Sequence, residues 1–74
     1  MVLRVVKTSE FRKFLESKGC RYDRTKASHE IWKCPKCFRS ITFRGAEKTI
    51  PELHLRTNLA TMGLKLKALY DWLD

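Results

Sequence analysis

The stretch that decides the fold runs from residue 20 to residue 44 and is CRYDRTKASHEIWKCPKCFRSITFR. Three segments within it, 20–26, 28–34 and 38–44, are each about seven residues long and rich in aromatic and β-branched residues, with turn-forming residues between them. Such a composition favours strands over helices. The spacing therefore predicts three short strands that follow one another directly along the chain.

A proline in the turn and the alternation of apolar with polar residues indicate how the strands are arranged. Pro35 lies where the second and third segments have to reverse direction, and a proline suits a turn better than a central strand. Ile41 and Phe43 alternate with polar residues, which is typical of a sheet with one face in water. We expect a three-stranded antiparallel sheet with one face packed against helices.

Along the chain, one helix is expected before the three strands and another after them. The first covers residues 8–18, where Thr8 or Ser9 would cap the free N–H groups and Gly19 would end the helix. Helical spacing places three apolar side chains on one face of it, namely Phe11, Phe14 and Leu15.

The second helix is expected over residues 63–73, with Thr61 as its cap. Its apolar side consists of Leu66, Leu69, Tyr70 and Leu73. Residues 45–62 have the weakest pattern. Residues 50–52 are interpreted as the start of a short helical turn, and the stretch around Leu55 and Leu59 is expected to pack over the core. The predicted fold class is therefore α+β, in the order α-β-β-β-α, with the antiparallel sheet packed on two helices.

The composition limits the partners of such a chain. Its 74 residues suffice for one domain, and 16 Lys and Arg against 8 Asp and Glu leave a formal charge of +8. This surplus favours a polyanion such as nucleic acid or an acidic protein, the alternative being a basic protein with no such partner. Neither expected helix has a cationic face opposite a bulky apolar one, which argues against a membrane surface. No apolar run approaches the roughly 20 residues that cross a bilayer, so a cytoplasmic location is expected.

Three cysteines raise the question of a disulfide or a metal site. Cys20, Cys34 and Cys37 cannot all pair within one chain, and in the absence of a secretory signal they are expected to be reduced. Cys34 and Cys37 are spaced as half of a tetrahedral zinc site, which Cys20, His29 or His54 would have to complete. We expect a metal-free turn, with zinc held within one chain or between two chains as the alternatives.

Three short motifs occur in a characteristic order, at residues 27–32 (ASHEIW), 49–51 (TIP) and 63–65 (GLK). In the order and spacing of these motifs and in chain length, the sequence resembles the HicA toxin family of bacterial toxin–antitoxin systems over residues 8–73. The resemblance implies a fold similar to a double-stranded-RNA-binding domain, formed by a single HicA-like domain over residues 1–74. It also implies cleavage of messenger RNA and a HicB-like antitoxin as the protein partner.

The resemblance further implies a catalytic residue. The family motif is commonly Gly-Ser-His with an essential histidine, which corresponds to His29 in this chain. The chain departs from the motif at Ala27, where the family has glycine, and at Glu30, where a second histidine often follows. A downstream Pro-x-His pattern is stretched here to Pro51-Glu-Leu-His54, so His54 is a secondary candidate only.

One histidine is consistent with ribonuclease chemistry. RNA brings its own nucleophile, the 2′-hydroxyl, so the enzyme has to align the attack, move protons and stabilise charge on phosphorus. An imidazole with an ordinary pKa of about 6.5 exchanges protons at cellular pH. Neither a metal nor a small-molecule cofactor is needed. The residues expected to hold the RNA are Arg24, Lys26, Ser28, Lys33, Arg44 and Lys48.

Two other functions stay open at this point. The same charge and topology suit a non-catalytic double-stranded-RNA-binding module, in which the departures at Ala27 and Glu30 mark lost activity. A zinc-stabilised interaction domain built on the turn from Cys34 to Cys37 is the third candidate.

Overall fold

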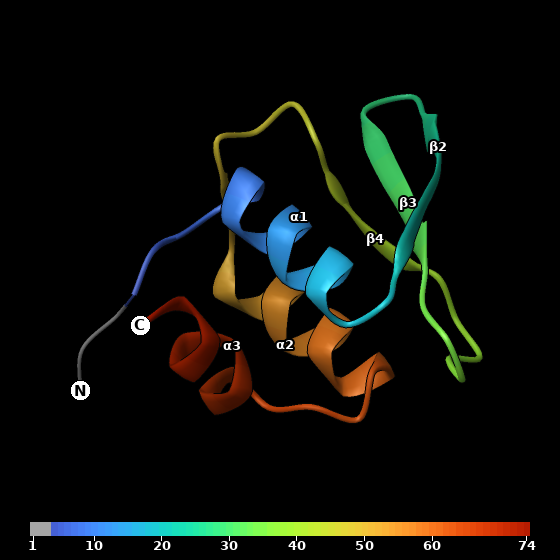
Figure 1. Ribbon diagram of the computed structural model, residues 1–74. Coiled ribbons are helices and arrows are strands. Elements are labelled where there is room, and N and C mark those ends of the chain that lie inside the picture. The colour runs from blue at the N-terminus through green and yellow to red at the C-terminus, as the bar shows by residue number, and fades with distance from the viewer. Residues whose placement is uncertain (1–3) are drawn as a thin grey trace.

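The structure, a computed structural model, describes residues 4–74, so the first three residues of the expected domain lie outside it. Figure 1 shows three helices packed together and a twisted pair of strands, β2 and β3, that projects beyond them. The elements in chain order are β1 (Val6–Lys7), α1 (Thr8–Ser17), β2 (Arg21–Lys26), β3 (His29–Lys33), β4 (Ile41–Arg44), β5 (Thr49–Ile50), α2 (Glu52–Thr61) and α3 (Leu66–Leu73). None of the helices in residues 4–74 has the length and apolar character needed to span a lipid bilayer.

The expected three-stranded antiparallel sheet is confirmed, and with it the α+β class. The strands lie in the order β2-β3-β4, so β2 and β4 form its edges. The chain reverses between β3 and β4, where the Cys37 N–H donates to the Cys34 carbonyl over 3.3 Å. A second sheet pairs β1 with β5 in antiparallel orientation. Its strands have two residues each, which is too short to produce a recognisable sequence pattern.

Helix α1 forms where the sequence predicts it, and its expected apolar stripe is fully buried. The expected cap is wrong, because neither Thr8 nor Ser9 caps the helix. The Glu10 carboxylate instead accepts the Lys7 N–H at 2.9 Å. Thr8 lies already inside the helix, and its hydroxyl donates to the Glu47 carbonyl over 2.5 Å. Thr8 therefore joins α1 to the loop before β5.

Glycines in the left-handed region of φ follow both α1 and α2. Gly19, at φ +83°, ends α1 as expected. Gly63, at φ +74°, ends α2. The prediction that the last helix begins at Gly63 is therefore wrong. Helix α3 starts only at Leu66, and the expected cap Thr61 is the last residue of α2. The apolar side predicted for α3 does pack against the core.

Helix α2 corrects the predicted element order. Residues 52–61 form a helix of 10 residues rather than a short helical turn. Leu55 and Leu59 are buried in the core, as expected, but the third buried side chain of α2 is that of Asn58. Because this polar residue interrupts the apolar stripe, the sequence pattern of residues 52–61 does not indicate a helix. The sheet is therefore followed by two helices, and the order is α-β-β-β-α-α when the two short strands are left aside.

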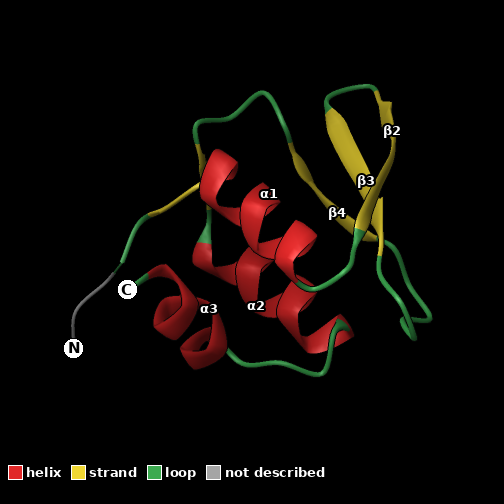
Figure 2. Cartoon of the chain, in the orientation of Figure 1, coloured by secondary structure: helices red, strands yellow, loops and turns green. Residues whose placement is uncertain are grey.

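Figure 2 shows the helices beside the three-stranded sheet, and the buried side chains of the core come from the helices and from one face of that sheet. Trp32 of β3 points into the core and is 4 % exposed, and Ile41 and Phe43 of β4 are almost completely buried. The Phe43 ring meets Phe11 edge to face, with 5.4 Å between the centroids. Each such side chain contributes about 1.5–3 kcal/mol by leaving water. The side chains on one face of the sheet are thus buried in the core and stabilise the fold.

A disulfide contradicts the expectation of three reduced cysteines. Cys20, directly before β2, is bonded to Cys34, directly after β3, and Cys37 is a free thiol. The antiparallel register explains the contact, because Arg21 pairs with Lys33 and the residues just outside this pair then face each other. The odd number of cysteines does not prevent one pair from forming.

Alkylation followed by mass spectrometry tests this disulfide. In the unfolded chain without reductant, iodoacetamide should label Cys37 alone, whereas after reduction it should label all three cysteines. Because the bond spans a sequence separation of 14, its reduction should lower the free energy of unfolding by about 3 kcal/mol in a urea titration. Three labelled cysteines without reductant would contradict the structure.

Candidate nucleic-acid interface

A row of three side chains crosses the face of the sheet that is turned away from the helices. His29 of β3 lies opposite Lys26 of β2 and opposite Arg44 of β4, so all three point to the same side. Neighbouring strands are about 4.8 Å apart, which sets the imidazole between two cations. Lys26 and Arg44 are exposed and His29 is half-buried. We call Lys26, His29 and Arg44 the basic row.

Further cations lie on the same face. Arg24 lies opposite Ile31, and Arg21 lies opposite Lys33. Arg24 forms an ion pair with its neighbour Asp23. The other cations of this face take part in none of the ion pairs found in residues 4–74. Most of the positive charge here is therefore uncompensated.

The remaining two residues expected to bind RNA, Ser28 and Lys48, do not lie on this face. Ser28 belongs to the turn between β2 and β3, where its carbonyl accepts the Gly45 N–H at 3.1 Å. Lys48 lies in the loop before β5, and its carbonyl accepts the Thr8 N–H at 2.9 Å. The sheet face thus gathers four of the six expected residues with His29, namely Arg24, Lys26, Lys33 and Arg44.

Ala27 occupies a turn position that would suit glycine. Its φ is +56°, in the left-handed region, where a residue with a Cβ is disfavoured by about 1–2 kcal/mol. The glycine of the motif that this stretch resembles would relax the turn between β2 and β3. Having alanine instead of glycine at position 27 therefore strains the turn whose backbone continues directly into His29.

Glu30 faces the helices and is not part of the basic row. Arg12 of α1 donates from Nε to both carboxylate oxygens over 3.1 Å, and Trp32 Nε1 donates to Oε1 over 3.1 Å. The hydrogen bonds from Arg12 are the main cause that lowers the pKa of Glu30, against the opposing effect of burial. Glu30 thus attaches α1 to the inner face of the sheet.

Gly45, directly after β4, leaves the room that this network needs. A Cβ at this position would overlap the Glu30 side chain. Arg12 Nη2 also donates to the Gly45 carbonyl over 3.0 Å, so one guanidinium holds both Glu30 and the end of β4. Because Gly45 is next to Arg44, the contacts of Arg12 and Glu30 at Gly45 also fix the backbone at the Arg44 end of the basic row, from the inner face of the sheet.

The free edge of β4 is closed by a side chain rather than by a strand. The Asn58 amide of α2 accepts the Thr42 N–H at 3.3 Å and donates to the Thr42 carbonyl over 2.9 Å. Asn58 is 6 % exposed, and a polar group left unpaired at such a site costs about 1–3 kcal/mol. The two bonds imitate a neighbouring strand and fix the position of α2 along β4. We call them the Asn58 clamp.

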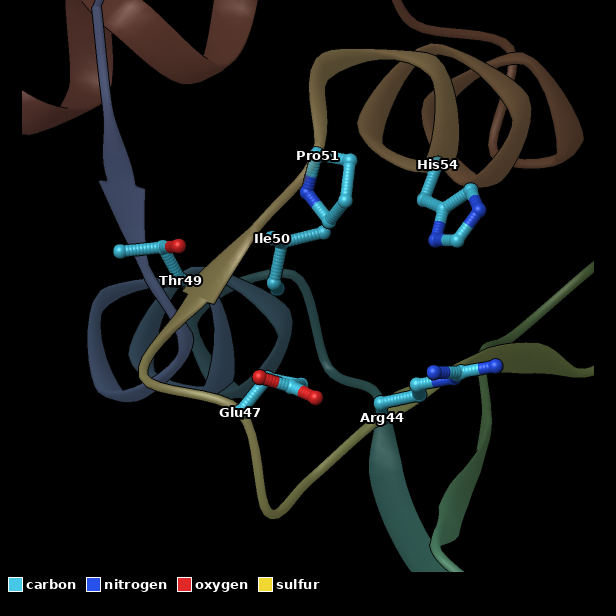
Figure 3. A pocket seen from close by; sticks show the side chains of 6 residues that line it. All are labelled: Arg44, Glu47, Thr49, Ile50, Pro51 and His54. Atoms are coloured by element: carbon cyan, nitrogen blue, oxygen red, sulfur yellow. The ribbon is translucent and has the colours of Figure 1, made fainter.

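A hollow of about 220 Å³ beside the clamp is lined by both histidines of the chain. Its other lining residues are Thr42, Phe43, Arg44, Thr57 and Asn58. An adjoining hollow of about 330 Å³ shares Arg44 and His54 and extends along the loop to Pro51. In Figure 3, His54 from the first turn of α2 and Arg44 from β4 border the same opening. The sequence could not associate His54 with the basic row, because its pattern does not predict α2.

The turn from Cys34 to Cys37 does not present the pair of thiolates on which the zinc alternative depends. Cys34 is bonded to Cys20, which leaves the Cys37 thiol. Within the part of the chain that the structure describes, no three His, Cys, Asp or Glu side chains gather as a metal site.

Comparisons with protein-family models, with curated proteins and with solved structures return no match to this chain. They assign it no family. The features of the molecule from which a function can be inferred are therefore the basic row, the cations around it and the hollow between β4 and α2.

Replacing Glu30 by glutamine should make the fold less stable at neutral pH and less sensitive to acid. Because the pKa of Glu30 is lowered on folding, its contribution is present above the unfolded value of about 4.3 and is lost as the pH falls through the folded value. Arg12 is 35 % exposed, so water screens the pair, and we expect a loss of about 1 kcal/mol at neutral pH. Urea titrations at about pH 7 and about pH 3 measure both effects.

The matched control is Glu52→Gln, because Glu52 pairs with Arg56 on the surface of α2 and is 41 % exposed. This variant should unfold much like the wild type at both pH values. If the wild type and E30Q lose stability in parallel on acidification, the assigned contribution of Glu30 is wrong.

Proposed function

We propose that the protein is a toxin of the HicA type, a metal-independent endoribonuclease that cleaves messenger RNA with His29 as a proton-transfer residue. The observation that carries this proposal is the basic row, in which His29 lies between Lys26 and Arg44 on an exposed sheet face. The resemblance of three sequence motifs to the HicA family supports the same conclusion.

The charge of the sheet face suits an RNA backbone. Lys26, Lys33 and Arg44 keep their charges free of ion pairs within residues 4–74. Each phosphate that such a cation contacts releases condensed counterions, so the affinity for RNA falls as the salt concentration rises. Contacts of this kind position the RNA without reading its sequence.

Cleavage would start from the RNA itself. The 2′-hydroxyl attacks the neighbouring phosphorus, and the bond to the 5′-oxygen breaks, which leaves a 2′,3′-cyclic phosphate and a 5′-hydroxyl. His29 transfers a proton in this reaction, an effect that contributes about 10²–10⁴-fold to the rate. Lys26 and Arg44 would stabilise the negative charge that develops on the phosphate oxygens on either side of the imidazole.

We also propose that the fold is a variant of the double-stranded-RNA-binding domain. The order of α1, the three-stranded antiparallel sheet and a following helix supports this assignment. Helix α2, which lies between the sheet and α3 in the sequence, is an addition to the two-helix scheme.

A HicB-like antitoxin is the proposed protein partner. A formal charge of +8 on 74 residues attracts an acidic protein surface as well as RNA. A partner of that charge would cover the sheet face and exclude RNA from the basic row by occupying the same cations.

A non-catalytic RNA-binding module is the second candidate. Two observations favour it: Ala27 stands at a left-handed turn position, and Glu30, in place of a histidine, is engaged by Arg12. Such a module would bind RNA through the same cations and leave it intact.

Replacing His29 by alanine tests the proposed function. Purified wild-type protein and the variant are incubated with end-labelled messenger RNA in the presence of EDTA. We expect the wild type to cleave the RNA and H29A to cleave it at least about 100-fold more slowly. The dissociation constant for RNA should change by less than about threefold, because the cations of the sheet face remain.

The control is Lys13→Ala, an exposed lysine of α1 on the opposite side of the sheet from the basic row. Circular dichroism confirms that each variant is folded. RNA bound but left intact by the wild type would favour the binding module. Equal cleavage by the wild type and H29A would remove His29 from the mechanism.

A further inference from the structure

The position of His54 follows from the Asn58 clamp. His54 precedes Asn58 by one turn of α2, an advance of about 6 Å along the helix axis. Arg44 follows Thr42 by two residues of β4, an advance of about 7 Å along the strand. The clamp bonds Asn58 to Thr42, and His54 and Arg44 line the same hollow. The two advances therefore run in the same direction from the clamp and bring His54 beside Arg44.

His29 reaches the same place from the other side of Arg44. It lies opposite Arg44 in the register of β3 and β4, and it lines the hollow together with His54. Two imidazoles from different elements therefore border one opening of about 220 Å³, with a guanidinium next to both.

Neither imidazole is used to hold the fold together. Within residues 4–74, no side-chain hydrogen bond involves His29 or His54. His54 is exposed on the first turn of α2, and His29 is half-buried. Both side chains are therefore free to contact a ligand in the hollow.

We propose that His54 is the second catalytic residue of the ribonuclease site and transfers a proton on the opposite side of the scissile phosphate from His29. This inference rests on the proposed function and adds a second group to its mechanism. Arg44, next to both imidazoles, holds the non-bridging phosphate oxygens between them.

Two proton transfers make this chemistry balance. One imidazole accepts the proton of the 2′-hydroxyl as that oxygen forms its bond to phosphorus. The other imidazole, protonated at the start, gives its proton to the 5′-oxygen as the bond between phosphorus and that oxygen breaks. The first histidine ends protonated and the second neutral, and proton exchange with water restores both. A pair of imidazoles with one phosphate between them would supply both transfers.

The pH dependence of single-turnover cleavage tests this pairing. The wild type should give a bell-shaped profile, because one histidine must be neutral and the other protonated. In H54A the maximum rate should fall at least about 100-fold and one limb of the profile should disappear. The dissociation constant for RNA should stay within about threefold of the wild-type value. A residue that acts only through the fold would lower the rate without removing a limb.

The matched control is Leu53→Ala, because Leu53 is the neighbouring residue of the same turn, is 70 % exposed and carries no group that transfers protons. L53A should keep the rate and both limbs. His54→Gln, which keeps a polar side chain on the exposed turn, repeats the test if H54A proves less stable in thermal melts.

The outcomes separate this inference from the proposed function. If the wild type cleaves RNA, H29A does not, and H54A keeps the wild-type rate or both limbs, the inference about His54 is overturned and the role of His29 stands. If the wild type leaves RNA uncut, the proposed function fails, and the catalytic role of His54 fails with it.

Discussion

Two hydrogen bonds between the Asn58 side chain and the Thr42 backbone fix the position of α2 along the edge of the sheet. As the edge of the sheet, β4 would otherwise expose an unpaired N–H and carbonyl, which invite pairing with another chain. At Thr42 the Asn58 amide takes the place of a fourth strand and pairs both backbone groups of that residue. It also fixes α2 against the sheet, which buries Leu55 and Leu59 and brings the first turn of α2 to Arg44.

The register of β3 separates the residues that hold the fold from those that are available to a ligand. Successive residues of a strand point to opposite faces, so Glu30 and Trp32 face α1 while His29 lies in the basic row. A shift of the pairing by one residue would exchange these two sets. The ion pair between Glu30 and Arg12 therefore stabilises the register in which His29 is accessible. The proposed ribonuclease site is a consequence of this alternation.

The three-stranded sheet and α1 could be predicted because their signals are local, such as the alternation around Ile41 and Phe43. Helix α2 could not, because its buried Asn58 is satisfied only by Thr42, which belongs to a different element. The disulfide could not be predicted either, because it depends on the register of β2 and β3, and the number of cysteines says nothing about that register. His29 could be singled out only through the resemblance of residues 27–32 to the HicA motif, because Ile31 and Trp32 put a large apolar side chain on each face of β3 and the alternation alone does not show which face is exposed. The hollow that His29 shares with His54 could not, since it depends on how α2 docks.

Amide hydrogen exchange at Thr42 is the most direct test of the Asn58 clamp. If the clamp forms, the Thr42 N–H should be protected in the wild type as strongly as amides paired inside the sheet, although β4 is an edge strand. In a folded N58A variant this protection should be lost at Thr42 before it is lost elsewhere in β4. Exchange of the wild-type Thr42 N–H at the rate of a solvent-exposed amide would contradict the clamp and, with it, the placement of α2 beside the basic row.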